Sequence, residues 1–135
     1  FHTDSFKARI HRYCLDAQGT LGDKTLWRQF DARQGVPDGM CFDAEGCLWI
    51  AFWGGGCVRR FGLDGELLQS IELPPRQVTS VAFGGTDFAT LLVTSARVGL
   101  GAAALQAQAL AGATFALRPG IRGLPALGHG TLSGE

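Results

Sequence analysis

Asp38 is the residue of this sequence whose type and surroundings best suit chemistry. It lies in the run Val-Pro-Asp-Gly-Met at residues 36–40, where proline directs the chain, glycine permits an unusual backbone angle and a carboxylate stands between them. An apolar, strand-like segment follows at once. If that strand borders a pocket, the carboxylate can meet a ligand there. In the alternative interpretation, Asp38 caps a Pro-Asp-Gly turn by accepting hydrogen bonds from nearby backbone amides.

The other reactive side chains form no catalytic or metal-binding motif. No strand or helical spacing unites the three histidines, which are His2, His11 and His129. Ser5 and Ser95 lack the Gly-x-Ser-x-Gly pattern of serine hydrolases. The three glycines at 54–56 open a strand and not a helix, so a hairpin explains them better than a phosphate site. Trp49 and Trp53 could wall a sugar pocket or pack between neighbouring sheets.

Cysteine usage and the sequence start indicate a cytoplasmic protein cut from a larger one. Four cysteines stand in strand-like runs without a CxxC pair, so we expect buried, reduced thiols: Cys14, Cys41, Cys47 and Cys57. The chain as given shows neither a secretory signal nor an apolar stretch of about 18 residues. It opens abruptly on Phe1, which we interpret as a cut inside a larger protein.

The composition excludes partners that are recognised through net charge. Lysine plus arginine equal aspartate plus glutamate at 12 each, which disfavours nucleic acid, a membrane surface or acidic substrates as partners. A hydrophobic content of 46% is ample for a buried core, while 20 glycines and nine phenylalanines favour short strands joined by tight turns. We therefore expect a small ligand that is recognised locally.

An internal repeat divides the chain into strand units. Residues 8–16 align without gaps on residues 56–64, which lie 48 positions later, and Phe42 and Phe83 mark a second repeat of 41 positions. Units of roughly 40 to 50 residues with four short strands are typical of β-propeller blades, with an ordinary β-sandwich as the alternative. The sequence therefore predicts an all-β fold, a partial β-propeller with about three blades.

The repeat also assigns individual positions. Asp38 precedes a strand near the propeller axis, so its carboxylate is expected at the mouth of the central channel. His11 occupies the position of Arg59 and is expected to be solvated. Asp43 and Asp64 fall in hairpin turns, where alanine should cost little stability.

Two segments depart from the repeat. Residues 100–110 are rich in alanine and leucine and predict a short helix within a propeller segment that spans residues 1–117. Residues 118–135 contain two prolines and five glycines and are expected to form a loosely held C-terminal tail.

Several motifs resemble the regucalcin, senescence-marker-protein and gluconolactonase family. The most specific is Pro-Asp-Gly-Met followed by a Leu-Trp strand. The resemblance implies a six-bladed β-propeller, of which residues 1–117 are the C-terminal half, and a hydrolase that converts aldonolactones to aldonic acids. It also implies one divalent cation, calcium or zinc, with magnesium or manganese as further possibilities. The matching segments are residues 37–51, 54–56, 58–61, 79–85, 93–97 and 117–125.

The same resemblance gives Asp38 two roles, as a metal ligand and as the general base. The family's other ligands, a glutamate and an asparagine in a Ser-Asn-Gly turn, have no counterpart in this sequence. Because a hard cation needs several oxygen ligands, this chain alone is expected to lack a complete site. Its substrate-binding residues stay unassigned.

Three functions are therefore open. The chain is part of a metal-dependent sugar-lactone hydrolase, a non-catalytic calcium-binding propeller or scaffold module, or an inactive fragment. The expected partners are a sugar lactone and, to close the ring, either a second copy of the chain or a missing N-terminal half.

Overall fold

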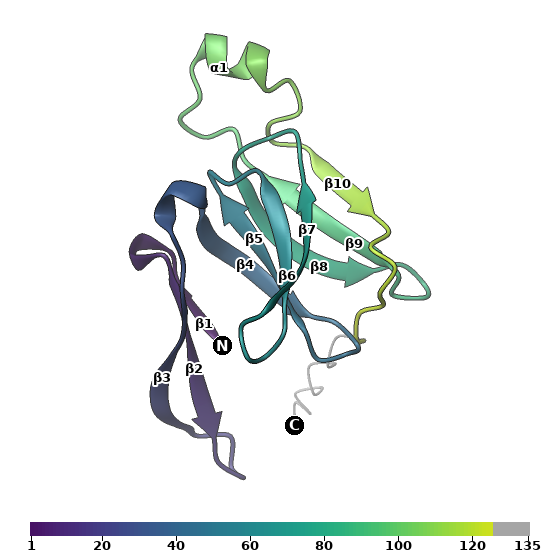
Figure 1. Ribbon diagram of the computed structural model, residues 1–135. Helices are drawn as coiled ribbons and strands as arrows, with labels where there is room; N and C mark the ends of the chain where they lie inside the picture. The colour runs from purple at the N-terminus through teal and green to yellow at the C-terminus, as the bar shows by residue number, and fades with distance from the viewer. Residues whose placement is uncertain (126–135) are drawn as a thin grey trace, which may run out of the picture.

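The computed structural model describes residues 1–125, which form three antiparallel sheets in chain order (Figure 1). The first sheet contains β1 (His2–Asp4), β2 (Arg9–Leu15) and β3 (Leu21–Gln29). The second contains β4 (Val36–Phe42), β5 (Leu48–Trp53), β6 (Cys57–Phe61) and β7 (Leu67–Glu72). The third contains β8 (Val78–Gly84), β9 (Thr90–Ser95) and β10 (Thr114–Leu117). The connections include the 3-10 turns η1 (Ser5–Lys7) and η2 (Ala32–Gln34) and the helix α1 (Ala102–Ala107).

The strand order matches the sequence repeat. The second sheet runs β4-β5-β6-β7, so each strand pairs with its neighbour along the chain. The repeat of 48 positions places β2 on β6, and the repeat of 41 positions places β4 on β8. The first sheet thus corresponds to the last three strands of the second, and the third sheet to its first three. An all-β, partial propeller is confirmed.

Two hydrophobic cores hold the sheets together, one on each face of the second sheet. Strand β5 serves both, because successive side chains point to opposite faces: Ile50 and Phe52 face the first sheet, whereas Trp49 and Ala51 face the third. This explains why β5 is apolar throughout. The first core contains Ile10, Leu48, Ile50, Phe52, Cys57 and Phe61. The second contains Trp49, Ala51, Val58, Leu73, Val78, Val81, Leu91 and Val93.

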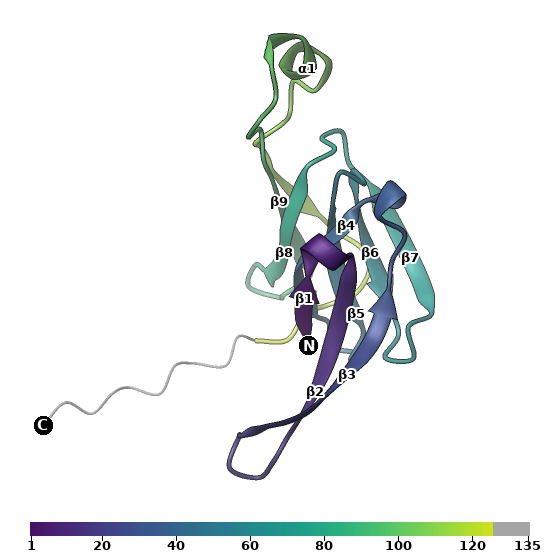
Figure 2. The same ribbon diagram turned by 90° about the vertical axis from the view of Figure 1, so that its left-hand side faces the viewer.

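Two segments project from this packed body. The end of the β2–β3 hairpin extends past the second sheet (Figure 2), and Leu15 and Leu21 near its tip are each 65% exposed. Helix α1 stands away from the sheets at the opposite end. It lies inside the stretch where the sequence predicts a helix. No helix among residues 1–125 is long and apolar enough to span a membrane.

The beginning of the C-terminal segment is fixed to the sheets. The Ala44 amide donates to the Arg122 carbonyl oxygen at 2.8 Å, and the Gly123 amide donates to the Phe88 carbonyl oxygen at 2.8 Å. Gly123 also forms a β-bridge with Asp43. A Cβ on Gly123 would collide with the Phe83 side chain. The prediction of a loosely held C-terminal tail is therefore wrong at residues 122–123. The rest of the predicted tail at residues 126–135, which includes His129, lies outside the residues that the structure describes.

Asp43 is a buried charge and not a simple turn residue. Its side chain is fully buried and accepts hydrogen bonds from Trp49 Nε1 at 2.9 Å and Arg60 Nε at 2.7 Å. The backbone amides of Glu45 and Cys47 donate to its other oxygen, each at 3.0 Å. The expectation that alanine at position 43 costs little stability is therefore wrong, because side chains from β5 and β6 enclose the carboxylate.

Two further burial predictions are wrong. His11 is only 7% exposed, because it lies in the central strand of its sheet between His2 and Leu26. Burial lowers its pKa, with Lys24 and other charges as smaller causes.

All four cysteines are free, but Cys14 is exposed because it lies on the projecting β2–β3 hairpin; Cys57 is the buried one of the four.

Candidate functional site

Asp38 lies inside strand β4, at a point where the pairing with β5 is irregular. Pro37 pairs with Phe52 and Met40 with Ile50, so β4 carries one extra residue between these two pairs. Such a β-bulge re-aims a side chain, and bulges are common beside active sites. The Thr3 hydroxyl of β1 donates to the Asp38 carbonyl oxygen at 3.1 Å and ties this stretch to the first sheet.

The glycine that follows Asp38 is required by packing. A Cβ on Gly39 would lie 2.7 Å from the Ser80 Cα of strand β8. Strands β4 and β8 are the corresponding first strands of the second and third sheets, and they approach each other closely here. Gly39 thus allows the two sheets to meet directly beside the Asp38 carboxylate.

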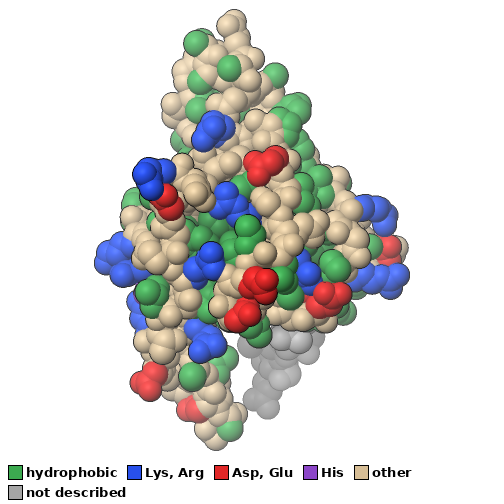
Figure 3. All heavy atoms as spheres, in the orientation of Figure 1, with side chains coloured by type: hydrophobic (Ala, Val, Ile, Leu, Met, Phe, Trp, Pro, Cys, Tyr) green, Lys and Arg blue, Asp and Glu red, His purple; other side chains and the backbone are tan. Residues whose placement is uncertain are grey.

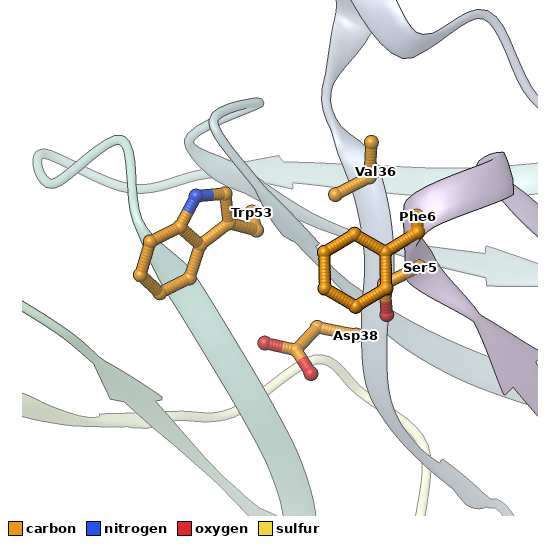
Figure 4. Close-up of a pocket in the computed structure, with 5 residues that line it drawn as sticks. All are labelled: Ser5, Phe6, Val36, Asp38 and Trp53. Carbon is orange, nitrogen blue, oxygen red and sulfur yellow. The ribbon is translucent and has the colours of Figure 1, made fainter.

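The Asp38 carboxylate borders a pocket of about 530 Å³. The connection η1 between β1 and β2 contributes Ser5 and Phe6, and the second sheet contributes Val36, Asp38 and Trp53. Figure 4 shows the carboxylate near the Trp53 and Phe6 rings. The pocket is therefore bounded by aromatic and apolar side chains around one acidic group.

Asp38 has no partner for its negative charge among residues 1–125. Its carboxylate accepts no hydrogen bond and forms no ion pair with these residues, and burial raises its pKa above the ordinary aspartate value. The amides expected for a turn cap do not bind it. A half-buried carboxylate with a raised pKa suits a general base, because its conjugate acid forms closer to neutral pH.

The described residues do not fit a resident metal ion by themselves. No group of three or more His, Cys, Asp or Glu side chains in residues 1–125 could hold one. A hard cation takes about six to eight oxygen ligands, and Asp38 contributes one carboxylate. Any cation at Asp38 would need further ligands from outside the described residues.

The 48-residue repeat relates two of the residues that line the pocket. Trp49 is fully buried between sheets, whereas Trp53 lines the pocket. Extending the 48-residue repeat backwards aligns Ser5 with Trp53, and both residues line the pocket. The sequence predicts no role in the pocket for Ser5 or for Phe6, which is fully exposed and belongs to no motif.

Comparison with known proteins identifies relatives along nearly the whole chain. Residues 1–97 match the family described as SMP-30/Gluconolactonase/LRE-like region. The chain is 42% identical over 124 residues to 6-deoxy-6-sulfogluconolactonase of Pseudomonas putida, covering 91% of this chain and 43% of that protein. It is 38% identical over 128 residues to regucalcin of Danio rerio, covering 93% of this chain and 43% of that protein.

Solved structures agree with these relatives. A calcium-binding protein, regucalcin, from Agrobacterium tumefaciens gives a TM-score of 0.82 at 38% identity and covers 90% of this chain and 42% of its own. A luciferin-regenerating enzyme gives a TM-score of 0.79 at 31% identity, and the match covers 91% of this chain and 42% of that enzyme. The chain thus spans about two fifths of the length of the relatives it matches.

Proposed function

Because the chain belongs to the SMP-30/gluconolactonase/LRE-like family, we propose that it is part of a sugar-lactone hydrolase whose general base is Asp38. The reaction is the hydrolysis of aldonolactones to aldonic acids. One observation carries the proposal: the Asp38 carboxylate is half-buried in a pocket and has no partner for its charge among the described residues. The name of the sulfogluconolactonase relative supports a lactone substrate.

In the proposed reaction, Asp38 accepts a proton from the water that attacks the lactone carbonyl carbon. The ring C–O bond then breaks, and the alkoxide oxygen takes a proton from the protonated Asp38. One water is consumed, and the product is a hydroxy acid. The rings of Trp53 and Phe6 suit the apolar face of a sugar ring, and the pocket volume suits a single sugar.

We extend the proposal to one divalent cation with Asp38 among its ligands. Calcium or zinc is the first choice, and magnesium or manganese comes next. The relative from Agrobacterium tumefaciens, named a calcium-binding protein, supports this extension. Because residues 1–125 supply too few ligands, the remaining oxygens would come from elsewhere, and the proton transfer above relies on Asp38 alone.

We also propose a cytoplasmic protein whose first and third sheets are covered by further blades. The four free cysteines support the location. The blades could come from a second copy of this chain or from an N-terminal half. Light scattering on the 135-residue chain tests the first source: a dimer is expected, and a stable monomer at micromolar concentration would contradict it.

The hydrolase is tested by replacing the matching segment of the Pseudomonas putida relative with residues 1–125 of this chain. The hybrid should hydrolyse glucono-δ-lactone. The reaction is followed by the protons it releases, which a pH indicator detects. Asp38→Asn should remove turnover, because the amide accepts no proton at neutral pH. Asp64→Asn is the matched control, since Asp64 accepts one exposed hydrogen bond from the Glu66 amide in a turn.

Two results would overturn the assignment. A folded Asp38→Asn hybrid that keeps full activity would remove Asp38 from catalysis. A folded but inactive hybrid that still binds calcium would favour the calcium-binding module over the hydrolase. Addition of a chelator to the active hybrid separately tests the cation.

A further inference from the structure

A second concave site lies between the first two sheets, away from the pocket of Asp38. It has a volume of about 400 Å³ and is lined by parts of β3, η2, β6 and β7. On the face shown in Figure 3, basic and hydrophobic side chains lie on this side of the molecule together with several acidic ones. The lining residues that matter are the arginines Arg28 and Arg59, the aromatic residues Phe30 and Phe61, and the acidic residue Asp31.

Each of the two arginines lies over at least one aromatic ring. The Arg59 guanidinium carbon lies 4.5 Å from the centroid of Phe52, and that of Arg28 lies 4.9 Å from Phe61 and 5.5 Å from Phe30. A cation–π contact restrains a guanidinium over the ring but leaves its N–H groups available for hydrogen bonds. Both cations are therefore held at the site by contacts within the protein.

Neither guanidinium has an acidic partner within residues 1–125. Arg28 donates one hydrogen bond to the Gly65 carbonyl oxygen, and its buried Nε has no partner among these residues. Arg59 forms no ion pair there.

The acidic residue of the site is already engaged. Arg33 donates to the Asp31 carboxylate from Nε and Nη2, at 2.7 Å for the shorter contact, and the Arg33 amide donates to it as well. The negative charge of Asp31 is thus offset locally, and the site retains the excess positive charge of Arg28 and Arg59.

We propose that this site binds a small oxyanion-bearing molecule through Arg28 and Arg59. A carboxylate or a phosphate group would meet the two guanidinium edges, which match the planar arrangement of such oxygens. The aromatic rings of Phe30 and Phe61 would contact the remainder of the ligand. The ligand class is a sugar acid, a sugar phosphate or a molecule of similar size and charge.

The test uses the complete 135-residue chain labelled with ¹⁵N and titrated at constant ionic strength. Inorganic phosphate is the first probe, gluconate the second and neutral glucose the control. The Nε–H signals of Arg28 and Arg59 should shift saturably with phosphate or gluconate, with a dissociation constant of roughly millimolar order, and not with glucose. The tighter of the two anions identifies the preferred group.

Variants separate this site from general charge attraction. Arg59→Gln should weaken binding about tenfold, because a charge-assisted hydrogen-bond pair is lost. Arg118→Gln is the matched control; it removes the same charge from an exposed residue that pairs with Asp87 in the turn between β8 and β9, and affinity should stay unchanged. Equal weakening in both variants, or no saturable shift in the unmodified chain, would overturn the proposal. The unmodified titration decides the question even if Arg59→Gln does not fold.

Discussion

Replacing Asp43 by alanine should be among the most destabilising single changes in this chain. The carboxylate is fully buried and accepts four hydrogen bonds, two from backbone amides and two from the side chains of Trp49 and Arg60. Its removal leaves four donors without an acceptor, and Arg60 keeps only its contact with Glu45 at 2.7 Å. Breaking a buried charge pair on one side costs about 3–5 kcal/mol. That is a large part of the total stability of a domain.

Urea unfolding followed by tryptophan fluorescence measures this cost, because Trp49 lies beside the carboxylate. Glu45→Ala is the control: its side chain is 60% exposed, so the loss should be about 0–1 kcal/mol. The double variant Asp43→Asn/Arg60→Met should lose less than the sum of its single changes, because no buried charge is left unpaired. If Asp43→Ala loses no more than Glu45→Ala, the carboxylate does not support the fold as described.

The same pair predicts a pH dependence. Although desolvation raises the pKa of Asp43, the hydrogen bonds from Arg60, Cys47 and Trp49 outweigh it and hold the pKa below the ordinary value of 3.8. A depressed folded-state pKa stabilises the protein above the unfolded value, and this contribution is lost as the pH falls through the folded value. Unmodified protein should therefore lose more unfolding free energy below about pH 4 than Asp43→Asn does.

Three further outcomes follow from the site and its surroundings. Gly39→Ala should destabilise the protein by about 1–3 kcal/mol in thermal unfolding, because its Cβ would meet Ser80; an unchanged melting temperature would refute the close approach of β4 and β8. Asp38→Asn should leave the fold as stable or more stable near neutral pH, because burial raises the pKa of Asp38 and disfavours its charged form; a clear loss in urea unfolding would reveal a structural partner. In thiol labelling of the native protein, Cys14 should react first and Cys57 last, because burial shields the Cys57 thiol and also raises its pKa; labelling of Cys57 as fast as Cys14 would contradict this.

The sequence predicted the strands well because the repeat is a local, one-dimensional signal. The offset of 48 positions found the pair β2 and β6, and the Phe42–Phe83 spacing found β4 and β8. Asp38 was singled out by its proline and glycine neighbours. The position of Asp38 inside strand β4 could not be predicted, because a β-bulge within a strand and a turn at the start of a strand can have the same Pro-Asp-Gly sequence.

The errors concern residues whose environment is made by distant parts of the chain. Asp43 and Asp64 both precede turn glycines, yet only Asp43 lies next to Arg60 and Trp49 on the neighbouring strands. His11 shares a repeat position with Arg59, but its neighbours across the sheet differ. Strand alternation cannot reveal such pairings, because they depend on which side chains the adjacent strands present.

The attachment of residues 122–123 also bears on how the molecule folds. Asp43 and Gly123 are about eighty residues apart in the chain, and bringing such distant segments together costs loop entropy before any contact is gained. During synthesis, the turn between β4 and β5 must wait for almost all of the described chain before the Ala44 amide finds its acceptor on Arg122. Late protection of the Ala44 amide in pulse-labelled refolding would therefore mark the last step of assembly, when the second and third sheets become one cooperative unit.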